Sequence, residues 1–435
     1  MEIKEIIKNA RERLHIESLT PLQNKLANLP SSVAHVQAIA PTGSGKTLGF
    51  ALAMLKRTKG ATGHIESLVI APTRELTLQI AKVLSQLAPK LRITAVYGGH
   101  RVIDESRSLE AATPDILVGT PGRILDHITR GRIDLYRVKT LVTDEYDKSL
   151  ELGFQDEMRR IVRKIRRPQQ IILTSATRQD DDLPEWLGAN KPLVIDYSEN
   201  EAEKPQIKEY IFKSTEADKL LALKTLLLRL PQERTIVFVN HRESAERVYG
   251  FVSKSGFPTV LYHGALDQQD REIAVDIFTN GTAPIMIATD LAARGLDIPQ
   301  VRSVIHYHSP SSDEILTHRN GRAARMGAEG EAYHILAPNE SYAAPEFTGN
   351  APSVWAKPYT SLYFHAGKRE KLSKSDILGA LTGPGNLSAT EVGLISLHDH
   401  YAVAAISSDK AKSVAAALNA ARIKNRKIRV TLKTL

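Results

Sequence analysis

The strongest constraint on the fold of this chain is an alternation of short apolar runs with segments of helical periodicity, which occurs in two successive blocks. Continuously apolar runs separated by helices form parallel sheets that are covered on both faces. In the first block the predicted strands are Val36–Ala40, Leu68–Ala71, Ile93–Tyr97, Ile116–Gly119, Leu141–Thr143, Ile171–Thr174 and Leu193–Asp196. In the second block they are Ile236–Val239, Val260–Tyr262, Ile285–Ala288, Val304–Tyr307 and Ala332–Leu336. The sequence therefore predicts two α/β domains in series.

The two blocks are bounded by segments that break this pattern. Tyr197–Gln206 is charged and contains a proline, and residues 338–360 are rich in Pro, Ala, Ser and Asn, so we interpret both as linkers. Residues 361–435 follow the order strand, helix, two strands, helix, strand. We therefore predict α/β domains at residues 1–198 and 207–338, and a small α+β domain at residues 361–435.

Composition excludes several classes of protein. The 435 residues are 42% hydrophobic and 25% charged, which is ordinary for a globular protein. The chain has no cysteine, which excludes disulfides, zinc knuckles, iron–sulfur clusters and thiol catalysis. No apolar stretch approaches the ~20 residues that span a bilayer, and the charged, amphipathic N-terminal segment has no signal core. We therefore expect a cytoplasmic protein without a membrane partner.

The formal net charge of +9 is unevenly distributed along the chain. Residues 361–435 contain 12 basic and 5 acidic residues and so carry +7, which leaves +2 for the first 360 residues. A near-neutral body with a basic end suggests an attached module that binds a polyanion. The alternative is a solvated basic surface that binds nothing.

A glycine-rich loop directly follows the first predicted strand and precedes a helical segment, which is the context of a phosphate-binding loop. Gly43 and Gly45 allow a tight turn that points backbone N–H groups at phosphate, and the helix N-terminus adds positive potential. Lys46 can reach the β- and γ-phosphates, and Thr47 can hold Mg²⁺. The loop residues predicted to bind ATP are Ala40, Pro41, Thr42, Gly43, Ser44, Gly45, Lys46 and Thr47.

An acidic pair follows another predicted strand, in the sequence Leu-Val-Thr-Asp-Glu-Tyr-Asp at residues 141–147. Asp144 can coordinate Mg²⁺ through water, and Glu145 is placed to orient and deprotonate an attacking water. An isolated acidic pair is usually a solvated strand end. In combination with the phosphate loop, the pair predicts a site that hydrolyses ATP.

These motifs, and others in the same order, resemble those of DEAD-box RNA helicases of superfamily two, from about residue 14 to residue 337. Residues 144–147 occupy the position of Asp-Glu-Ala-Asp, and residues 175–177, Ser-Ala-Thr, match the motif that couples hydrolysis to duplex opening. Residues 318–325 match the arginine-finger motif. The resemblance implies two RecA-like domains that close around ATP and RNA and separate strands locally.

The resemblance assigns roles to further residues. Thr20 and Gln23 match the Q motif, which recognises adenine in this family, and Asp297 belongs to the motif where both ligands meet. Arg322 and Arg325 are implied arginine fingers, and their spacing of three places them on one face of a helix. The implied coupling residues are Asp147, Ser175, Thr177 and His318. The implied RNA contacts are Pro72, Thr73, Arg74, Gly98, Gly99, Thr120, Arg123, Gln268, Arg271, Thr289 and Arg294.

Three departures from the family pattern affect these expectations. Tyr146 replaces the alanine of Asp-Glu-Ala-Asp, so the packing beneath the loop must adjust while activity is retained. Ala324 replaces a glycine, which limits backbone freedom there. Residues 1–22 contain no aromatic side chain to stack on adenine, so adenine selectivity depends on Thr20 and Gln23.

Residues 361–435 resemble the small RNA-binding domain that ends DbpA- and CsdA-type bacterial DEAD-box proteins, with the strand order of an RNA-recognition motif. In Lys424–Lys433, alternation places Ile428, Val430 and Leu432 on one face and Lys427, Arg429 and Lys433 on the other. We expect base stacking to be weak, because residues 400–406 contain a single aromatic side chain. The residues predicted to bind RNA are Lys424, Arg426, Lys427 and Arg429. A dimerisation or folding-support module is the alternative.

The sequence therefore predicts a monomeric, cytoplasmic RNA helicase that uses ATP and Mg²⁺ to remodel structured RNA. The resemblance implies that this RNA is ribosomal and is bound during ribosome assembly, in pre-ribosomal particles. A non-catalytic, nucleotide-gated RNA clamp or scaffold is the alternative from another class. A DNA translocase is a third possibility, against which the motif set argues.

Overall fold

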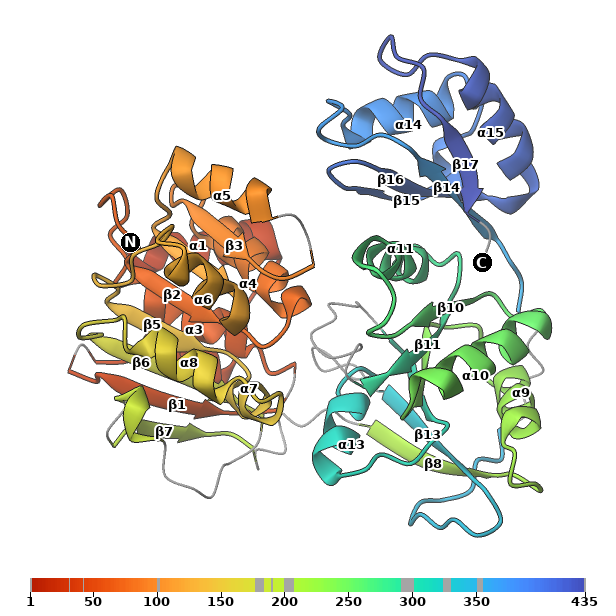
Figure 1. Ribbon diagram of the computed structural model, residues 1–435. Coiled ribbons are helices and arrows are strands. Elements are labelled where there is room, and N and C mark those ends of the chain that lie inside the picture. The colour runs from red at the N-terminus through yellow and green to blue at the C-terminus, as the bar shows by residue number, and fades with distance from the viewer. Residues whose placement is uncertain are drawn as a thin grey trace. The chain divides into compact units, whose positions relative to one another are not determined.

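The computed structural model (Figure 1) describes ten segments of the chain. They are residues 2–30, 32–41, 43–99, 102–176, 184–188, 191–198, 207–290, 301–323, 330–349 and 355–433. The described residues fall into two compact units, the first within residues 1–205 and the second within residues 206–435.

The first unit contains a seven-stranded sheet in the order β3-β4-β2-β5-β6-β1-β7, and every neighbouring pair is parallel. Its strands are β1 (His35–Ile39), β2 (Ser67–Ile70), β3 (Ile93–Val96), β4 (Ile116–Gly119), β5 (Thr140–Thr143), β6 (Gln170–Ser175) and β7 (Leu193–Asp196). All seven lie where the apolar runs predicted them, within one or two residues at each end.

Helices cover both faces of this sheet (Figure 1). They are α1 (Ile3–Leu14), α2 (Pro21–Ala27), α3 (Lys46–Leu55), α4 (Arg74–Leu87), α5 (Val102–Ala111), α6 (Pro121–Thr129), α7 (Tyr146–Glu151) and α8 (Gln155–Val162), with a short 3₁₀ helix at Glu185–Leu187. Alternate residues of one strand enter different cores. Val142 packs with α1 to α4, whereas Leu141 packs with α6 to α8. This double burial explains why the strands are apolar throughout.

The second unit begins with a six-stranded parallel sheet in the order β10-β11-β9-β12-β13-β8. Its strands are β8 (Ile207–Lys213), β9 (Thr235–Val239), β10 (Thr259–Tyr262), β11 (Ile285–Thr289), β12 (Ser303–His306) and β13 (Gly330–Leu336). Its helices are α9 (Leu220–Arg229), α10 (Arg242–Lys254), α11 (Gln268–Thr279) and α13 (Asp313–Asn320). The sequence prediction lacks β8, because this edge strand contains three charged residues among its seven instead of being apolar throughout.

The same unit ends in a four-stranded antiparallel sheet in the order β15-β16-β14-β17. Its elements are β14 (Tyr359–Phe364), α14 (Lys374–Thr382), β15 (Val392–Leu397), β16 (Ala402–Ser407), α15 (Ala411–Ala420) and β17 (Val430–Lys433), with 3₁₀ turns at Ala389–Glu391 and Ser408–Lys410. The predicted order of elements and the predicted fold class are therefore confirmed.

The last strand is shorter than the alternation in Lys424–Lys433 suggests. Ile423 and Arg426 close a tight turn, and pairing with β14 begins only at Val430. The predicted apolar face is nevertheless correct, since Ile428, Val430 and Leu432 all pack in the core beneath the sheet.

The segment before β14 is anchored to the second unit. The Trp355 ring is buried, its Nε1 donates to the carbonyl oxygen of Leu227 at 2.8 Å, and it packs edge-on against Phe257. Ala356 exchanges two hydrogen bonds with the Gln232 side chain, of 3.0 and 2.6 Å. Within the part of residues 338–360 that the structure describes, the predicted linker is therefore fixed at its end.

No helix among the described residues has the length and apolar character needed to span a bilayer.

We predict that Trp355→Ala lowers the free energy of unfolding by about 3–5 kcal/mol, because it removes a buried indole and leaves a cavity. Urea unfolding measures this change. The matched control is Leu221→Ala on α9, where the side chain is 59% exposed and the expected change is within about 0.5 kcal/mol. Equal effects of the two substitutions would show that Trp355 is not an anchor.

Candidate functional site

The phosphate loop has the backbone that its glycines were predicted to allow. Gly43 and Gly45 have φ angles of +90° and +81°, in the left-handed region that other residues rarely adopt. A Cβ atom on Gly45 would lie 2.0 Å from Nε2 of Gln23. The backbone angle therefore favours glycine at this position, and a larger residue would also displace the Gln23 amide.

Gln23 is held against the phosphate loop by its own helix cap. Thr20 and Gln23 form a reciprocal capping box at the start of α2, with bonds of 3.0 and 3.3 Å. Nε2 of Gln23 donates to the carbonyl oxygen of Gly45 at 3.2 Å. The Q-motif residues and the phosphate loop, 22 positions apart in sequence, thus form one site.

Lys46 is buried at the start of α3 and donates to the carbonyl oxygens of Ala40 and Pro41. Burial lowers the pKa of its ammonium, and the carboxylates of Asp144, Glu145 and Asp147 oppose that shift. These electrostatic interactions indicate that Lys46 lies close to the acidic residues that follow β5.

Asp144 is buried directly after β5. Its Oδ1 accepts from the Thr174 hydroxyl and from the backbone N–H of Glu145, the latter at 3.2 Å. Burial and the adjacent Glu145 carboxylate raise the pKa of Asp144 to about 6. The sequence motifs did not indicate Thr174 as a site residue, although it directly precedes the Ser-Ala-Thr motif.

Glu145 has a strained backbone, with φ +48° and ψ +55°. A non-glycine residue in this region costs on the order of 1–3 kcal/mol and persists where its surroundings hold it. The Glu145 N–H donates to Asp144 Oδ1 and to Thr174 Oγ1 at 3.3 Å, and α7 begins at the next residue. The strained residue therefore lies at the junction between the end of β5 and the start of α7.

Asp147 connects the acidic motif to the end of β6. Its Oδ2 accepts from the Ser175 hydroxyl at 2.9 Å and from the Ala176 N–H at 3.0 Å. The structure thus brings together two of the predicted coupling residues, Asp147 and Ser175.

The predicted RNA contacts of the first unit follow the ends of β2, β3 and β4, at the same sheet edge as the phosphate loop. The Arg74 guanidinium lies 4.6 Å from the centroid of the Tyr97 ring and donates to the carbonyl oxygen of Gly98 at 3.3 Å. Nε of Arg123 donates to the Tyr97 carbonyl oxygen at 2.9 Å. Thr73 caps α4 through its hydroxyl, Pro72 precedes it, and Thr120 is the N-cap residue of α6.

A buried carboxylate that the sequence motifs did not indicate, Glu105, holds the residues of this group in position. Glu105 accepts from the Tyr97 N–H at 2.8 Å, contacts Nε2 of His127 at 2.8 Å and pairs with Arg123 at 3.2 Å. Glu105 and His127 do not belong to a recognisable motif, so the sequence did not indicate them. They hold Arg123 and the Tyr97 backbone in place.

Arg319 is the centre of the polar cluster in the second unit. Its guanidinium binds both carboxylate oxygens of Asp290, after β11, and donates to Asn240 Oδ1, after β9, at 2.8 Å. It also donates to the His308 carbonyl oxygen at 2.7 Å and lies over the Phe238 ring. Motif spacing alone assigns Arg319 no role of its own, whereas the structure shows that it joins the residues after β9 and β11 to α13.

Family models match all three parts of the chain in succession. The DEAD/DEAH box helicase model matches residues 20–185, and the model of the helicase conserved C-terminal domain matches residues 218–327. The DbpA RNA binding domain matches residues 361–432. The chain is 33% identical to the ATP-dependent RNA helicase DbpA of Escherichia coli (strain K12), over 95% of this chain and 94% of that protein. This chain belongs to the DEAD-box ATP-dependent RNA helicases.

Other relatives agree with this assignment. The helicase is 35% identical to the ATP-dependent RNA helicase CshA of Listeria monocytogenes, over 78% of this chain and 65% of that protein. Saccharomyces cerevisiae Dbp5 bound to RNA and ADP BeF3 is 26% identical, with a TM-score of 0.68 over 77% of this chain and 88% of that chain. Mss116p bound to ssRNA and AMP-PNP gives the same identity and TM-score, over 77% and 73% of the two chains. The two parallel-sheet domains are thus RecA-like, and the helicase is an RNA-binding ATPase.

The predicted geometry of the arginine-finger motif is partly wrong. α13 ends at Asn320, so Arg322 lies in the turn that follows the helix instead of on its face, and its N–H donates to the Arg319 carbonyl oxygen at 3.0 Å. His318 is buried in α13. The predicted site residues Thr42, Thr177, Arg294, Asp297 and Arg325 lie outside the described residues, as does Ala324.

The remaining predicted RNA residues divide into two groups. Gln268 and Arg271 lie in the first turn of α11, and Thr289 ends β11. In the C-terminal domain, Lys424 pairs with Asp376 at 3.1 Å and Arg426 donates to the Glu370 carbonyl oxygen at 2.8 Å, so both are engaged in holding loops together. Lys427 and Arg429 are exposed. Lys433, which the alternation predicts on the same face as Arg429, lies 4.0 Å from Asp270 of α11.

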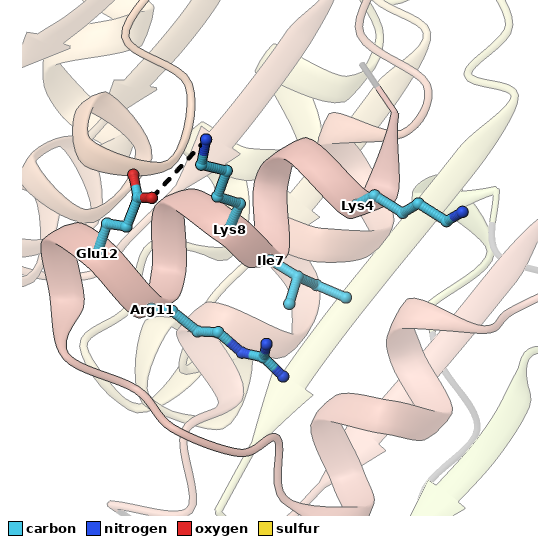
Figure 2. Close-up of a pocket in the computed structure, with 5 residues that line it drawn as sticks. All are labelled: Lys4, Ile7, Lys8, Arg11 and Glu12. Carbon is cyan, nitrogen blue, oxygen red and sulfur yellow. Dashed lines mark ion pairs between the residues drawn. The ribbon is translucent and has the colours of Figure 1, made fainter.

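One surface pocket lies on α1 and is separate from these motifs. Figure 2 shows its lining, which consists of Lys4, Ile7, Lys8, Arg11 and Glu12, all from one helix. Lys8 and Glu12 point toward one another as an exposed ion pair of 3.8 Å. None of the predicted site residues lines this pocket.

Tyr146, the departure from Asp-Glu-Ala-Asp, is accommodated in the core. Its side chain is 1% exposed and packs among α6, α8 and the sheet, and burial raises the pKa of its hydroxyl to about 12. Within the described segments, that hydroxyl has no hydrogen-bond partner. The larger side chain therefore adds apolar packing beneath the loop that carries Asp144 and Glu145.

We predict that Tyr146→Phe leaves the free energy of unfolding unchanged or raises it by about 1 kcal/mol, because it removes an unpaired buried hydroxyl. Tyr146→Ala should lower it by about 3–5 kcal/mol through the cavity that it creates. Urea unfolding of both variants tests this. A clear loss of stability in Tyr146→Phe would mean that the hydroxyl is bonded.

Proposed function

We propose that ATP is hydrolysed at the carboxyl edge of the first sheet, where Lys46 and Thr47 bind the phosphates and Glu145 acts as general base. The observation that carries this proposal is the fixed, strained backbone of Glu145 beside Asp144 and Thr174. Exchange of the Ala40 and Pro41 carbonyl oxygens for phosphate oxygens would free the Lys46 ammonium to bind substrate. The capping box of Thr20 and Gln23 supplies the edge of the site that meets adenine.

The residues present fit Mg²⁺, which prefers hard oxygen ligands and usually binds through one or two carboxylates together with substrate phosphates. Asp144, a buried carboxylate, and Thr47, a hydroxyl at the second position of α3, would hold it. No cluster of three or more His, Asp or Glu side chains suited to a metal occurs among the described residues, which agrees with a site completed by phosphate and water. When bound, Mg²⁺ neutralises negative charge on the phosphates.

The second RecA-like domain supplies cations to this reaction when the two domains close. Arg322, and Arg325 beside it in sequence, act as arginine fingers that stabilise charge developing on the γ-phosphate, an effect worth ~10³–10⁵ in rate. Arg319 positions this motif through Asp290 and Asn240. Asp297 contributes to the ATP site, and Asp147, Ser175, Thr177 and His318 couple it to RNA.

RNA is bound mainly through its backbone, which sets affinity but not sequence. In the first domain Arg74, Arg123, Thr120 and the Gly98–Gly99 backbone contact it, with Pro72 and Thr73 shaping the loop. In the second domain Gln268, Arg271, Thr289 and Arg294 do so. We further propose that the basic C-terminal domain directs this monomeric helicase to structured ribosomal RNA in the cytoplasm, during assembly of ribosomal particles. The match to the DbpA RNA binding domain and the charge of +7 support this role.

We predict that Glu145→Gln lowers RNA-stimulated ATP hydrolysis by ~10²–10⁴-fold, because the amide cannot accept a proton from water. Phosphate release measures the rate, and binding of fluorescent ATP and RNA should be retained. Glu12→Gln makes the same change in an exposed ion pair on α1 and should leave the rate unchanged. Unchanged phosphate release in Glu145→Gln would reject the assignment of the base.

We predict that the double variant Lys427→Gln and Arg429→Gln weakens binding to structured ribosomal RNA and lowers the salt slope of log Kd by about 1–2. Both side chains are exposed, so the fold should be retained. Stimulation of the ATPase by short unstructured RNA should not change. Sequencing of RNA crosslinked in cells should show ribosomal RNA enriched with the natural protein and depleted with the variant. The same RNA profile for both proteins would contradict the proposed targeting.

A further inference from the structure

A group of polar side chains joins the end of α13 to three strands of the second parallel sheet. We call it the Glu209 cluster, and its members are Glu209 of β8, His306 of β12, His334 of β13, Asn320 at the end of α13, and Tyr342. His306, His334 and Asn320 are buried. Only Asn320 lies within a motif that the sequence analysis singled out, and the proposed function gives none of the five a role.

The Glu209 carboxylate receives a hydrogen bond from each of three neighbours. Its Oε2 lies 2.9 Å from His334 Nε2 and accepts from Tyr342 Oη at 2.6 Å, and its Oε1 accepts from Asn320 Nδ2 at 3.3 Å. The bond with His334 lowers the pKa of Glu209, while burial opposes that shift. An ionised carboxylate can only accept hydrogen bonds, so it fixes all three partners as donors.

The orientation of Asn320 determines which nitrogen of His306 carries the proton. Because Asn320 Nδ2 donates to Glu209, its Oδ1 faces His306 and accepts from Nε2 at 2.9 Å. The Nδ1 atom of His306 is thereby left as an acceptor, and it lies 3.5 Å from Nη1 of Arg319. Burial, His334 and Arg319 hold the pKa of His306 well below its ordinary value. The neutral ring therefore donates at one nitrogen and accepts at the other.

The rings of the cluster support one another by stacking. The centroids of His306 and His334 are 4.4 Å apart, and those of His334 and Tyr342 are 3.7 Å apart, with nearly parallel planes in both pairs. Tyr342 belongs to the segment that returns along β8, where the Phe347 N–H donates to the Ile211 carbonyl oxygen at 2.9 Å. Rotation of either histidine would break a ring contact and a hydrogen bond together, so the stack holds both rings in place.

This chain of bonds leads to the turn that carries Arg322. The Arg322 N–H donates to the Arg319 carbonyl oxygen at 3.0 Å, and the Ala323 N–H donates to the Asn320 carbonyl oxygen at 2.9 Å. The cluster contacts the side chains of both residues that hold the turn, because His306 lies against Arg319 and bonds to Asn320. The position of the turn therefore depends on side chains of β8, β12 and β13.

We propose that Glu209, Asn320 and His306 are positioning residues, which orient Arg319 and the turn that carries Arg322. They act through the hydrogen bonds of Arg319 and Asn320, so they control where the Arg322 guanidinium lies when charge develops on the γ-phosphate. A displacement of about 1 Å at such a group costs ~10²-fold in rate. The inference rests on the proposed function of Arg322 as an arginine finger.

His306→Phe tests the hydrogen bonds of the cluster, because it keeps a ring against His334 but removes the donor to Asn320 and the acceptor for Arg319. We expect the kcat of RNA-stimulated ATP hydrolysis to fall at least about tenfold, with the KM for ATP within about twofold, since only the transition state loses stabilisation. Phosphate release measures both constants, at a temperature at which circular dichroism shows a folded protein. An unchanged kcat would overturn the proposal.

Two further variants separate positioning from a general loss of stability. In His306→Gln the amide N–H replaces the Nε2–H donor to Asn320, so kcat should return to within about threefold of that of the natural protein. Leu223→Ala, in the buried face of α9, should lower the urea midpoint of unfolding and leave kcat unchanged. A glutamine variant as slow as His306→Phe would contradict the proposal, because the hydrogen bonds would then not account for the loss.

Asn320→Asp provides a test that does not alter the ring stack. It replaces the donor to Glu209 by a second carboxylate, and the repulsion between the two raises the pKa of the pair. The protonated form restores the donor, so the ratio of the variant kcat to the natural kcat should be low at about pH 8 and rise toward pH 6. The titratable groups that face Asn320 are Glu209 and His306. A natural kcat at both pH values would count against positioning by the cluster.

Arg322→Ala distinguishes a failure of this proposal from a failure of the function on which it rests. If Arg322 is an arginine finger, its removal lowers kcat by ~10³–10⁵. An unchanged kcat in Arg322→Ala would reject the finger and the positioning together. A low kcat in Arg322→Ala with a natural kcat in His306→Phe would reject the positioning alone.

Discussion

Parallel pairing of the strands is the constraint on which the candidate site depends. In a parallel sheet the carboxyl ends of all strands meet at one edge, and loops from distant parts of the sequence become neighbours there. Residues that follow β1 and β5 form the phosphate loop and the acidic pair, and Ser175 at the end of β6 contacts Asp147. Residues that follow β2, β3 and β4 bring Arg74 and Arg123 together. The second sheet does the same for Asn240 and Asp290, and Arg319 of α13 binds both.

Buried hydrogen bonds hold these neighbouring residues in a fixed geometry. Thr174 holds both the Asp144 carboxylate and the Glu145 N–H, so the strained backbone of Glu145 cannot relax without leaving buried groups unpaired. Arg319 acts in the same way in the second domain, because its guanidinium has carboxylate, amide and carbonyl partners from three segments. These residues contact the motif residues and hold them in position.

The C-terminal domain shows how one fold can be used differently. Its strand order and its aromatic face are those of an RNA-recognition motif, yet acidic side chains of α11 cover that face. Lys427 and Arg429 nevertheless remain exposed.

The sequence by itself determined the two α/β folds, the order of elements in the C-terminal domain and the resemblance to the helicase family. Apolar periodicity reports which residues are buried, and the phosphate loop requires glycine at fixed positions. It missed β8, whose charged residues belong to a sheet edge, and it placed Arg322 on a helix that ends two residues earlier. Only the tertiary structure decided the partners of Thr174, Glu105 and Arg319, and the cover over Tyr363 and Tyr401. The physical reason is that periodicity shows that a side chain is buried but carries no information about which distant segment buries it.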